Sequence, residues 1–120
     1  IVNINYFMNC LTIDDDCIIE DNVILSSNCI LGGNVRIMKN SQLGIGTTVH
    51  QNQILGSYVM IGMKTIITKR INVKPGYVYY GKPAKMIKKN IIGLKRNKIS
   101  SDILKKEYKR FSKLKINNEK

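Results

Sequence analysis

An apolar residue stands at every sixth position over more than half of this chain. The series runs without a break through Ile1, Phe7, Ile13, Ile19, Leu25, Leu31, Ile37, Leu43, Val49, Leu55, Ile61, Ile67 and Val73. A period of six matches neither the turn of an α-helix nor the alternation of an ordinary strand. It is the period of a hexapeptide parallel β-helix, in which each hexapeptide supplies one short strand and one turn.

The repeat predicts a triangular prism wound from short strands. Three hexapeptides make one coil of about 18 residues, so residues about 18 apart should stack on one another. We therefore expect an all-β fold, a left-handed parallel β-helix of about four coils, followed by a short α-helical C-terminal tail. The first coil would leave an open strand edge at Ile1, and open edges invite aggregation. We therefore expect further hexapeptides to precede it.

Two other slots of the hexapeptide carry information. The fourth position after the anchor holds small or aliphatic residues, among them Cys17 and Cys29. We interpret these cysteines as small core side chains in a reducing, cytoplasmic compartment. The position directly after the anchor often holds glycine, at 32, 44, 56 and 62. This pattern predicts a tight corner whose backbone angles glycine tolerates.

The pattern changes near Pro75 and Gly76, where the pair favours a turn. We predict a hexapeptide-repeat domain over residues 1–81 and a basic extension over residues 82–120. In the extension, apolar residues recur at helical spacing from Ile103 to Leu114, which predicts a helix at about 102–115 capped by Ser101 or Asp102. We expect this helix to pack on the prism or on a neighbouring subunit; the alternative is a membrane-surface helix.

Charge is concentrated in the extension. The chain has 20 Lys and Arg against 8 Asp and Glu, a net charge of +12, and residues 82–120 hold fourteen of the cations but three of the acids. Such an excess attracts an acidic partner: a nucleotide diphosphate, an acidic carrier protein or an anionic membrane surface. A lysine-, asparagine- and isoleucine-rich chain from an AT-rich genome would have the same composition.

Composition also excludes several classes of function. The cations are not interleaved with a stacking platform of aromatic residues, so we expect no nucleic-acid partner. No apolar run approaches the ~20 residues of a membrane span, so we expect no integral membrane segment. The single histidine, His50, cannot build the zinc site of a prism-type carbonic anhydrase, and we expect no metal.

Five stretches carry a family resemblance. They are residues 15–17 (Asp-Asp-Cys), 31–35 (Leu-Gly-Gly-Asn-Val), 48–51 (Thr-Val-His-Gln), 56–62 and, beyond the prism, 90–96 (Asn-Ile-Ile-Gly-Leu-Lys-Arg). From Met8 to about Ser101, the chain resembles the C-terminal half of the UDP-N-acetylglucosamine O-acyltransferases, which begin lipid A synthesis. The Val-His-Gln corner followed by Gly-Leu-Lys-Arg is the most specific part of this resemblance.

The resemblance implies a homotrimer with active sites in the grooves between subunits. There a (3-hydroxy)acyl chain passes from acyl carrier protein to the sugar 3-hydroxyl of UDP-N-acetylglucosamine. The thioester donor is itself a substrate, so no separate cofactor is implied. The reaction needs a general base, donors for the thioester oxyanion, and groups that bind the diphosphate.

Three family histidines are replaced in this chain. Asp15 stands at the position of the catalytic histidine, Thr12 at that of a supporting histidine, and Asn34 at that of a third. A carboxylate with an ordinary pKa near ~4 is a poorer match to a hydroxyl than an imidazole near ~6.5. Asp15 is therefore either a substitute base or a solvated corner carboxylate in a weakened enzyme.

Other family positions are kept. His50 is retained, and the resemblance implies that it contacts substrate, with Gln51 beside it able to bond to a phosphate or a pantetheine amide. The resemblance places Asn90 and Arg96 at the uridine end of the nucleotide, although Ile92 and Asn97 replace an acid and an arginine there.

Two other functions remain open. An acetyl-CoA-dependent sugar O- or N-acetyltransferase is one, because Gly81-Lys82-Pro83-Ala84 resembles the Gly-Asn-Pro-Ala element of those enzymes. A trimeric prism that binds ligand without turnover is the other, because the expected histidine base is missing.

Overall fold

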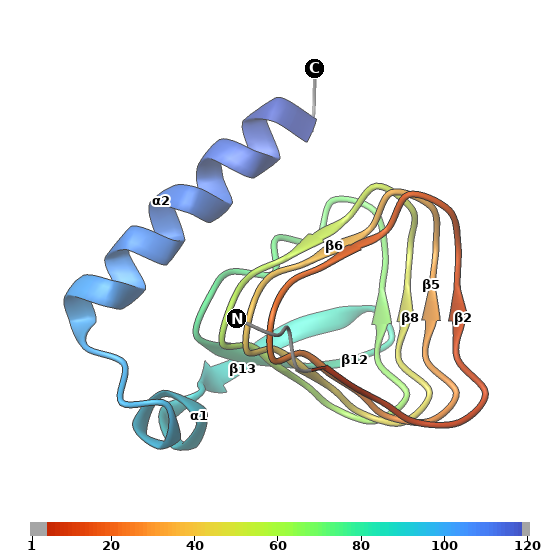
Figure 1. Ribbon diagram of the computed structural model, residues 1–120, viewed down its shortest axis with the longest axis horizontal. Coiled ribbons are helices and arrows are strands. Elements are labelled where there is room, and N and C mark those ends of the chain that lie inside the picture. Colours follow the sequence, from red (N-terminus) through yellow and green to blue (C-terminus); the bar gives the residue numbers. More distant parts are fainter. Residues whose placement is uncertain (1–4, 119–120) are drawn as a thin grey trace.

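The chain folds into a triangular prism of stacked coils with a helical C-terminal tail, as the computed structural model of residues 5–118 shows (Figure 1). Ile1, the first predicted anchor, lies outside these residues. Each coil consists of two-residue strands joined by turns: β1 (Tyr6–Phe7), β2 (Thr12–Ile13), β3 (Ile18–Ile19), β4 (Ile24–Leu25), β5 (Ile30–Leu31), β6 (Arg36–Ile37), β7 (Gln42–Leu43), β8 (Thr48–Val49), β9 (Ile54–Leu55), β10 (Met60–Ile61) and β11 (Ile66–Ile67).

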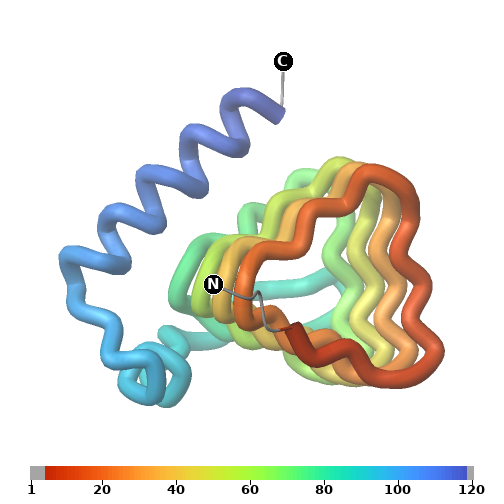
Figure 2. Tube along the Cα trace, in the orientation of Figure 1, coloured from red at the N-terminus to blue at the C-terminus, as the bar shows by residue number. Residues whose placement is uncertain are grey.

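The strands stack into three parallel sheets, one for each side of the prism (Figure 2). Face A contains β1, β4, β7 and β10; face B contains β2, β5, β8 and β11; face C contains β3, β6 and β9. On face A, Tyr6 pairs with Ile24, and Gln42 pairs with both Ile24 and Met60. Each pairing spans 18 residues, so the predicted left-handed parallel β-helix is confirmed.

The apolar anchors fill the interior of the prism. From Leu25 to Val73 every anchor has an exposed fraction of 2% or less. Phe7 and Ile13 are instead 49% and 38% exposed. They lie in the first described coil, where only one neighbouring coil covers them. Anchor burial therefore depends on a coil on each side.

The left-handed backbone of each corner falls three positions after the anchor, not directly after it. Positive φ angles occur at Asp16, Asn22, Asn28, Asn34, Asn40, Gly46 and Asn52, continuing through Tyr58, Lys64 and Arg70. Asparagine dominates this slot because its short polar side chain tolerates the left-handed region. The sequence-based assignment of turn geometry to the glycines after the anchors was therefore wrong. At Gly44, a Cβ would lie 2.8 Å from the Met63 nitrogen, so glycine there permits close stacking of coils.

The slot four after the anchor holds buried polar groups as well as aliphatic ones. Ser41 Oγ donates to the Gly56 carbonyl at 2.8 Å, and Thr65 Oγ1 donates to the Gly62 carbonyl at 2.7 Å. The Cys29 thiol is buried and donates to the Gly44 carbonyl at 3.3 Å. Burial raises the pKa of this thiol, so it stays protonated as a core side chain.

A hairpin closes the C-terminal end of the prism. Strand β12 (Tyr77–Gly81) pairs with β10, and β13 (Ala84–Lys89) runs antiparallel to β12. Val78 pairs with Lys88 and Tyr79 with Met86, so Ile87 is the extra residue of a bulge. Face A therefore continues to Lys89.

Two helices follow: α1 (Ile91–Arg96) and α2 (Ser101–Asn118). The predicted helical tail is confirmed, but the predicted cap is wrong, because Ser100 Oγ accepts the Ile103 N–H at 3.3 Å. Helix α2 lies beside the side of the prism that carries β6 (Figure 1). Phe111 and Leu114 pack there against Met38 and Ile54. No helix among the described residues is both long and apolar enough to cross a membrane.

An ion cluster also holds α2 to face C. Glu20 accepts hydrogen bonds from Arg36 and Arg110, and Arg110 also pairs with Glu107 of its own helix. Burial acts to raise the pKa of Glu20, but the bonds from Arg110 and Arg36 outweigh it and the pKa lies below its usual range. The pKa of Glu107 is lowered in the same way, chiefly by Arg110. The pKa of Arg110 is raised, first by its bonds to Glu20.

Candidate functional site

The corners between faces B and C stack into one ridge, which we call the B/C ridge. It consists of residues 14–16, 32–34, 50–52 and 68–70. Strand β2, which carries Thr12, leads into its first corner. Four of the candidates taken from the sequence, Asp15, Asn34, His50 and Gln51, lie on this ridge, and Thr12 lies at its border on face B.

Backbone hydrogen bonds fix the order of residues along the ridge. The Asn34 N–H donates to the Asp15 carbonyl at 3.1 Å, and the Asn52 N–H donates to the Gly33 carbonyl at 2.9 Å. Asp15, Gly33 and Gln51 therefore form one column across three coils. The column places a carboxylate and an amide about 10 Å apart, at ~4.8 Å per coil. Glycine between them leaves that interval without a side chain.

Glycine also sets how closely the next coil approaches. A Cβ at Gly32 would lie 2.7 Å from the Gln51 nitrogen and 3.0 Å from its Cα. Any larger residue would force the coil that carries His50 and Gln51 away from the coil that carries Asn34. Gly32 thus permits close stacking of the coils at the ridge, and Gly33 leaves the space between Asp15 and Gln51 free of a side chain.

The polar groups of the ridge are available to a ligand. The side chains of Thr12, Asp15, Asn34 and Gln51 are exposed and make no hydrogen bond within residues 5–118. His50 is exposed too, and its Nδ1 lies 3.1 Å from the Gln51 carbonyl oxygen. A carbonyl can only accept, so this contact favours a proton on Nδ1 and leaves the Nε2 lone pair free.

Charge changes sign along the ridge. Asp14, Asp15 and Asp16 lie in its first corner, and Lys69 and Arg70 lie in its last. The middle corners carry no formal charge with His50 neutral. A ligand lying along the ridge would therefore meet proton acceptors at one end and cations at the other.

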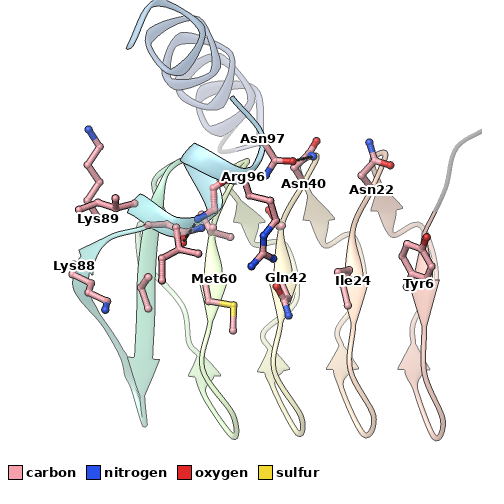
Figure 3. A pocket seen from close by; sticks show the side chains of 17 residues that line it. Tyr6, Asn22, Ile24, Asn40, Gln42, Met60, Lys88, Lys89, Arg96 and Asn97 are labelled. Carbon is pink, nitrogen blue, oxygen red and sulfur yellow. Dashed lines mark hydrogen bonds between the residues drawn. The ribbon is translucent and has the colours of Figure 1, made fainter. Parts of the chain in front are cut away.

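A groove of about 1050 Å³ lies on face A, away from the B/C ridge. Its floor is formed by outward residues of successive coils, Ile24, Gln42, Met60 and Val78, and its rim by β13 and α1 (Figure 3). These floor residues precede the anchors, and sequence reasoning missed them. Their 18-residue spacing and the apolar side chains at 24, 60 and 78 were the available signal.

Asn90 and Arg96 belong to this groove. The Asn90 amide donates to the Tyr58 carbonyl at 3.0 Å and accepts the Gly93 N–H at 3.3 Å, so it ties α1 to the prism. Arg96 reaches into the groove above Gln42 (Figure 3). Asn97, in contrast, is bonded to Asn40 at 3.2 Å. Arg96 is thus the side chain of α1 best placed to meet an anion.

The candidate residues therefore fall into two sets on different sides of the prism. One set lies on the B/C ridge, and Asn90 and Arg96 lie at the groove on face A; face C with helix α2 lies between them. A single chain does not bring the two sets together. Among the described residues, no cluster of three or more His, Cys, Asp and Glu side chains is placed to hold a metal ion.

Solved structures similar to this chain include acyl- and acetyltransferases. UDP-N-acetylglucosamine acyltransferase from Arabidopsis is 29% identical over 75% of this chain and 31% of its own, with a TM-score of 0.67. LpxA from Acinetobacter baumannii is 30% identical over 88% of this chain and 40% of its own, with a TM-score of 0.75. The acetyltransferase domain of PglB from Neisseria gonorrhoeae is 32% identical over 64% of this chain and 37% of its own, with a TM-score of 0.61.

The similarity supports membership of the hexapeptide-repeat acyltransferase superfamily. The chain spans less than half the length of each of these three proteins. No protein-family model matches the chain, and no curated protein sequence does.

Proposed function

We propose that this chain is the catalytic prism of an acyltransferase that moves an acyl group from a thioester to a nucleotide-linked sugar. The observation that supports this most directly is the B/C ridge, where the exposed side chains of Asp15, Asn34, His50 and Gln51 lie on successive corners and have, within residues 5–118, no bond except that of His50 Nδ1 to the Gln51 carbonyl. The sequence resemblance assigns them to the family's polar corner positions, and the chain is 29–30% identical to a UDP-N-acetylglucosamine acyltransferase and to LpxA.

The chemistry follows from the groups on the ridge. A sugar hydroxyl transfers its proton to a base as its oxygen attacks the thioester carbonyl; the C–S bond then breaks and the thiolate takes up a proton. Asp15 is the base at the family position, and the free Nε2 of His50 is a second proton acceptor. The Gln51 and Asn34 amides donate to the oxyanion or to a phosphate.

We further propose specific substrates and an assembly. The acyl group is a (3-hydroxy)acyl chain carried by acyl carrier protein, the acceptor is the 3-hydroxyl of UDP-N-acetylglucosamine, and the reaction is the first step of lipid A synthesis. The enzyme is a cytoplasmic homotrimer, in which the ridge of one copy faces the groove of its neighbour. The separation of Asn90 and Arg96 from the ridge supports this arrangement, because a site that needs both sets is incomplete in one chain.

Transfer assays with matched variants test the proposal. Purified protein should transfer acyl groups from acyl carrier protein to UDP-N-acetylglucosamine, and Asp15→Ala should abolish transfer. Asp21→Ala is the control, because Asp21 is a corner carboxylate between faces C and A. Nucleotide-sugar binding without turnover at any pH would leave the non-catalytic prism as the function.

A second candidate is an acetyl-CoA-dependent sugar acetyltransferase. The similarity to the PglB acetyltransferase domain favours it, and residues 81–84 form the turn between β12 and β13 in this chain. Transfer from acetyl-CoA but not from acyl carrier protein, in the same assay, would select this candidate.

A further inference from the structure

We infer that the outer side of helix α1 docks the protein on an anionic lipid bilayer. This surface is distinct from the ridge and goes beyond the proposed acyl transfer, although Lys89 and Ile91 also line the groove on face A. Its centre is a hollow of about 550 Å³, the α1 hollow, lined by Lys89, Ile91, Leu94, Lys95, Lys98 and Ile99. Three lysines therefore line one small depression together with the apolar side chains of Ile91, Leu94 and Ile99.

In the part of the chain that the structure describes, the lysines of the α1 hollow have no acidic partners. Within residues 5–118, every salt bridge involves Glu20 or Glu107, with Arg36 or Arg110 as the cation. Residues 82–101 contain seven Lys and Arg and no Asp or Glu, and the next acid is Asp102. The positive potential of this surface is therefore not neutralised by its own chain.

Exposed apolar side chains accompany these cations. Ile87, Ile91 and Ile92 are 56%, 55% and 69% exposed, and Met86 is 43% exposed. They lie at the end of β13 and on α1; Ile91 lines the α1 hollow, whereas Ile92 lines the groove on face A. Cations beside exposed aliphatic groups match the interface of an anionic bilayer, where lipid phosphates meet the ammonium groups and the aliphatic groups enter the acyl layer.

Other acidic partners fit this surface less well. Single-stranded nucleic acid would call for aromatic side chains among the cations, and residues 82–101 contain none. A docked acidic protein would bury its apolar contacts in a groove, whereas Met86, Ile87 and Ile91 are exposed on two elements and only Ile91 of the three lines the α1 hollow. Charge complementarity together with this spread of aliphatic groups favours a lipid surface.

Vesicle sedimentation with the full chain tests the inference. The protein should bind vesicles of phosphatidylcholine with phosphatidylglycerol, and not vesicles of phosphatidylcholine alone. Lys95→Gln with Lys98→Gln should weaken binding about 25-fold, at about fivefold per lysine. Ile91→Ser should weaken it about tenfold through loss of apolar burial.

The control removes two lysines elsewhere. Lys64→Gln with Lys113→Gln lowers the net charge equally, at a corner of faces A and B and on α2, and should change binding less than twofold. Equal loss in this control would overturn the inference in favour of an unspecific charge effect. Binding to soluble polyglutamate that Ile91→Ser leaves intact, without binding to vesicles, would assign the surface to an acidic protein instead. Circular dichroism checks that each variant folds.

Discussion

The guanidinium of Arg110 donates hydrogen bonds to both carboxylate oxygens of Glu20, with Nη1–Oε2 at 2.7 Å and Nη2–Oε1 at 2.6 Å. Ninety residues separate the partners, and the pair joins the middle of α2 to a corner of the first described coil. Glu20 also accepts from Arg36 Nε and from the Lys39 N–H, each at 3.0 Å. The position of α2 is therefore set by directional bonds as well as by the packing of Phe111.

Arg110→Ala should detach α2 from face C. The substitution leaves Glu20 and Glu107 without their main partner, and breaking a buried ion pair costs about 3–5 kcal/mol. The Arg110 side chain is 34% exposed, so solvent screening reduces the expected loss to about 2 kcal/mol. Chemical denaturation measures the loss, and limited proteolysis should cut within residues 97–100. Arg110→Lys should recover less than half of the stability, because lysine cannot form the bidentate pair.

Acid should release α2 in the same way. The folded-state pKa values of Glu20 and Glu107 lie below their usual value of 4.5, so their contribution to stability is complete above that value. The contribution is lost as the pH falls through the lowered values. We expect α2 to detach below pH 4.5. The NMR signals of Phe111 monitor this detachment. In Glu20→Gln, the acid transition should be smaller; an unchanged transition would contradict this role for Glu20.

Mixing two inactive variants should restore activity if the site lies between copies. Asp15→Ala removes a ridge group and Arg96→Ala removes a groove group, so each alone should be inactive. In a random mixture of equal amounts, about one site in four combines an intact ridge with an intact groove. Unfolding and refolding the two variants together should therefore restore about a quarter of the wild-type rate. If the refolded mixture stays inactive, a site shared between two copies is contradicted.

Asp15→His should raise the rate of acyl transfer. An imidazole is a better proton acceptor for a hydroxyl near neutral pH than a carboxylate, and general-base catalysis contributes about 10²–10⁴-fold. We expect kcat/KM to rise at least tenfold at neutral pH. His50→Ala separates the two possible bases: if wild-type activity falls as imidazoles become protonated, near pH ~6.5, and this variant is inactive, the base is His50.

Gly44→Ala should destabilise the prism although alanine is small. The added Cβ would lie 2.8 Å from the Met63 nitrogen and 2.9 Å from the Ile61 carbonyl oxygen, both backbone atoms of the next coil. We expect a loss of about 1–3 kcal/mol in the free energy of unfolding, measured by denaturant titration. Arg70→Asn is the counterpart: at φ 66° asparagine should stabilise the corner by about 0.5 kcal/mol.

The prism could be predicted because apolar residues alone mark its six-residue period. Each anchor from Leu25 onward meets the anchors of adjacent coils, so burial selects an apolar residue at each sixth position. The corner geometry was misassigned because glycine can serve either close stacking of coils or a left-handed backbone. The three-dimensional structure shows close stacking at Gly44 and a left-handed backbone at Gly46.

The sequence could place the ridge residues on corners of the prism, but it could not show on which side of the prism the residues after Lys89 lie. The assignment of Asp15, Asn34, His50 and Gln51 to one ridge follows from counting in steps of 18, once the coil length is known. The groove on face A depends on where the chain goes after Lys89. That path is set by local contacts such as the Asn90 bond to Tyr58, which no periodicity encodes.

The strict 18-residue register limits how such a molecule can change in evolution. Loss or gain of a single residue within a coil would shift each later anchor out of phase, whereas loss of a whole coil, such as residues 24–41, would rejoin Val23 to Gln42 with the phase intact. Distances along the ridge can therefore vary only in steps of about 4.8 Å. In descendants of this chain, the distance between Asp15 and Gln51 would change only by whole coils. Smaller changes in the geometry of the ridge would require substitutions of side chains.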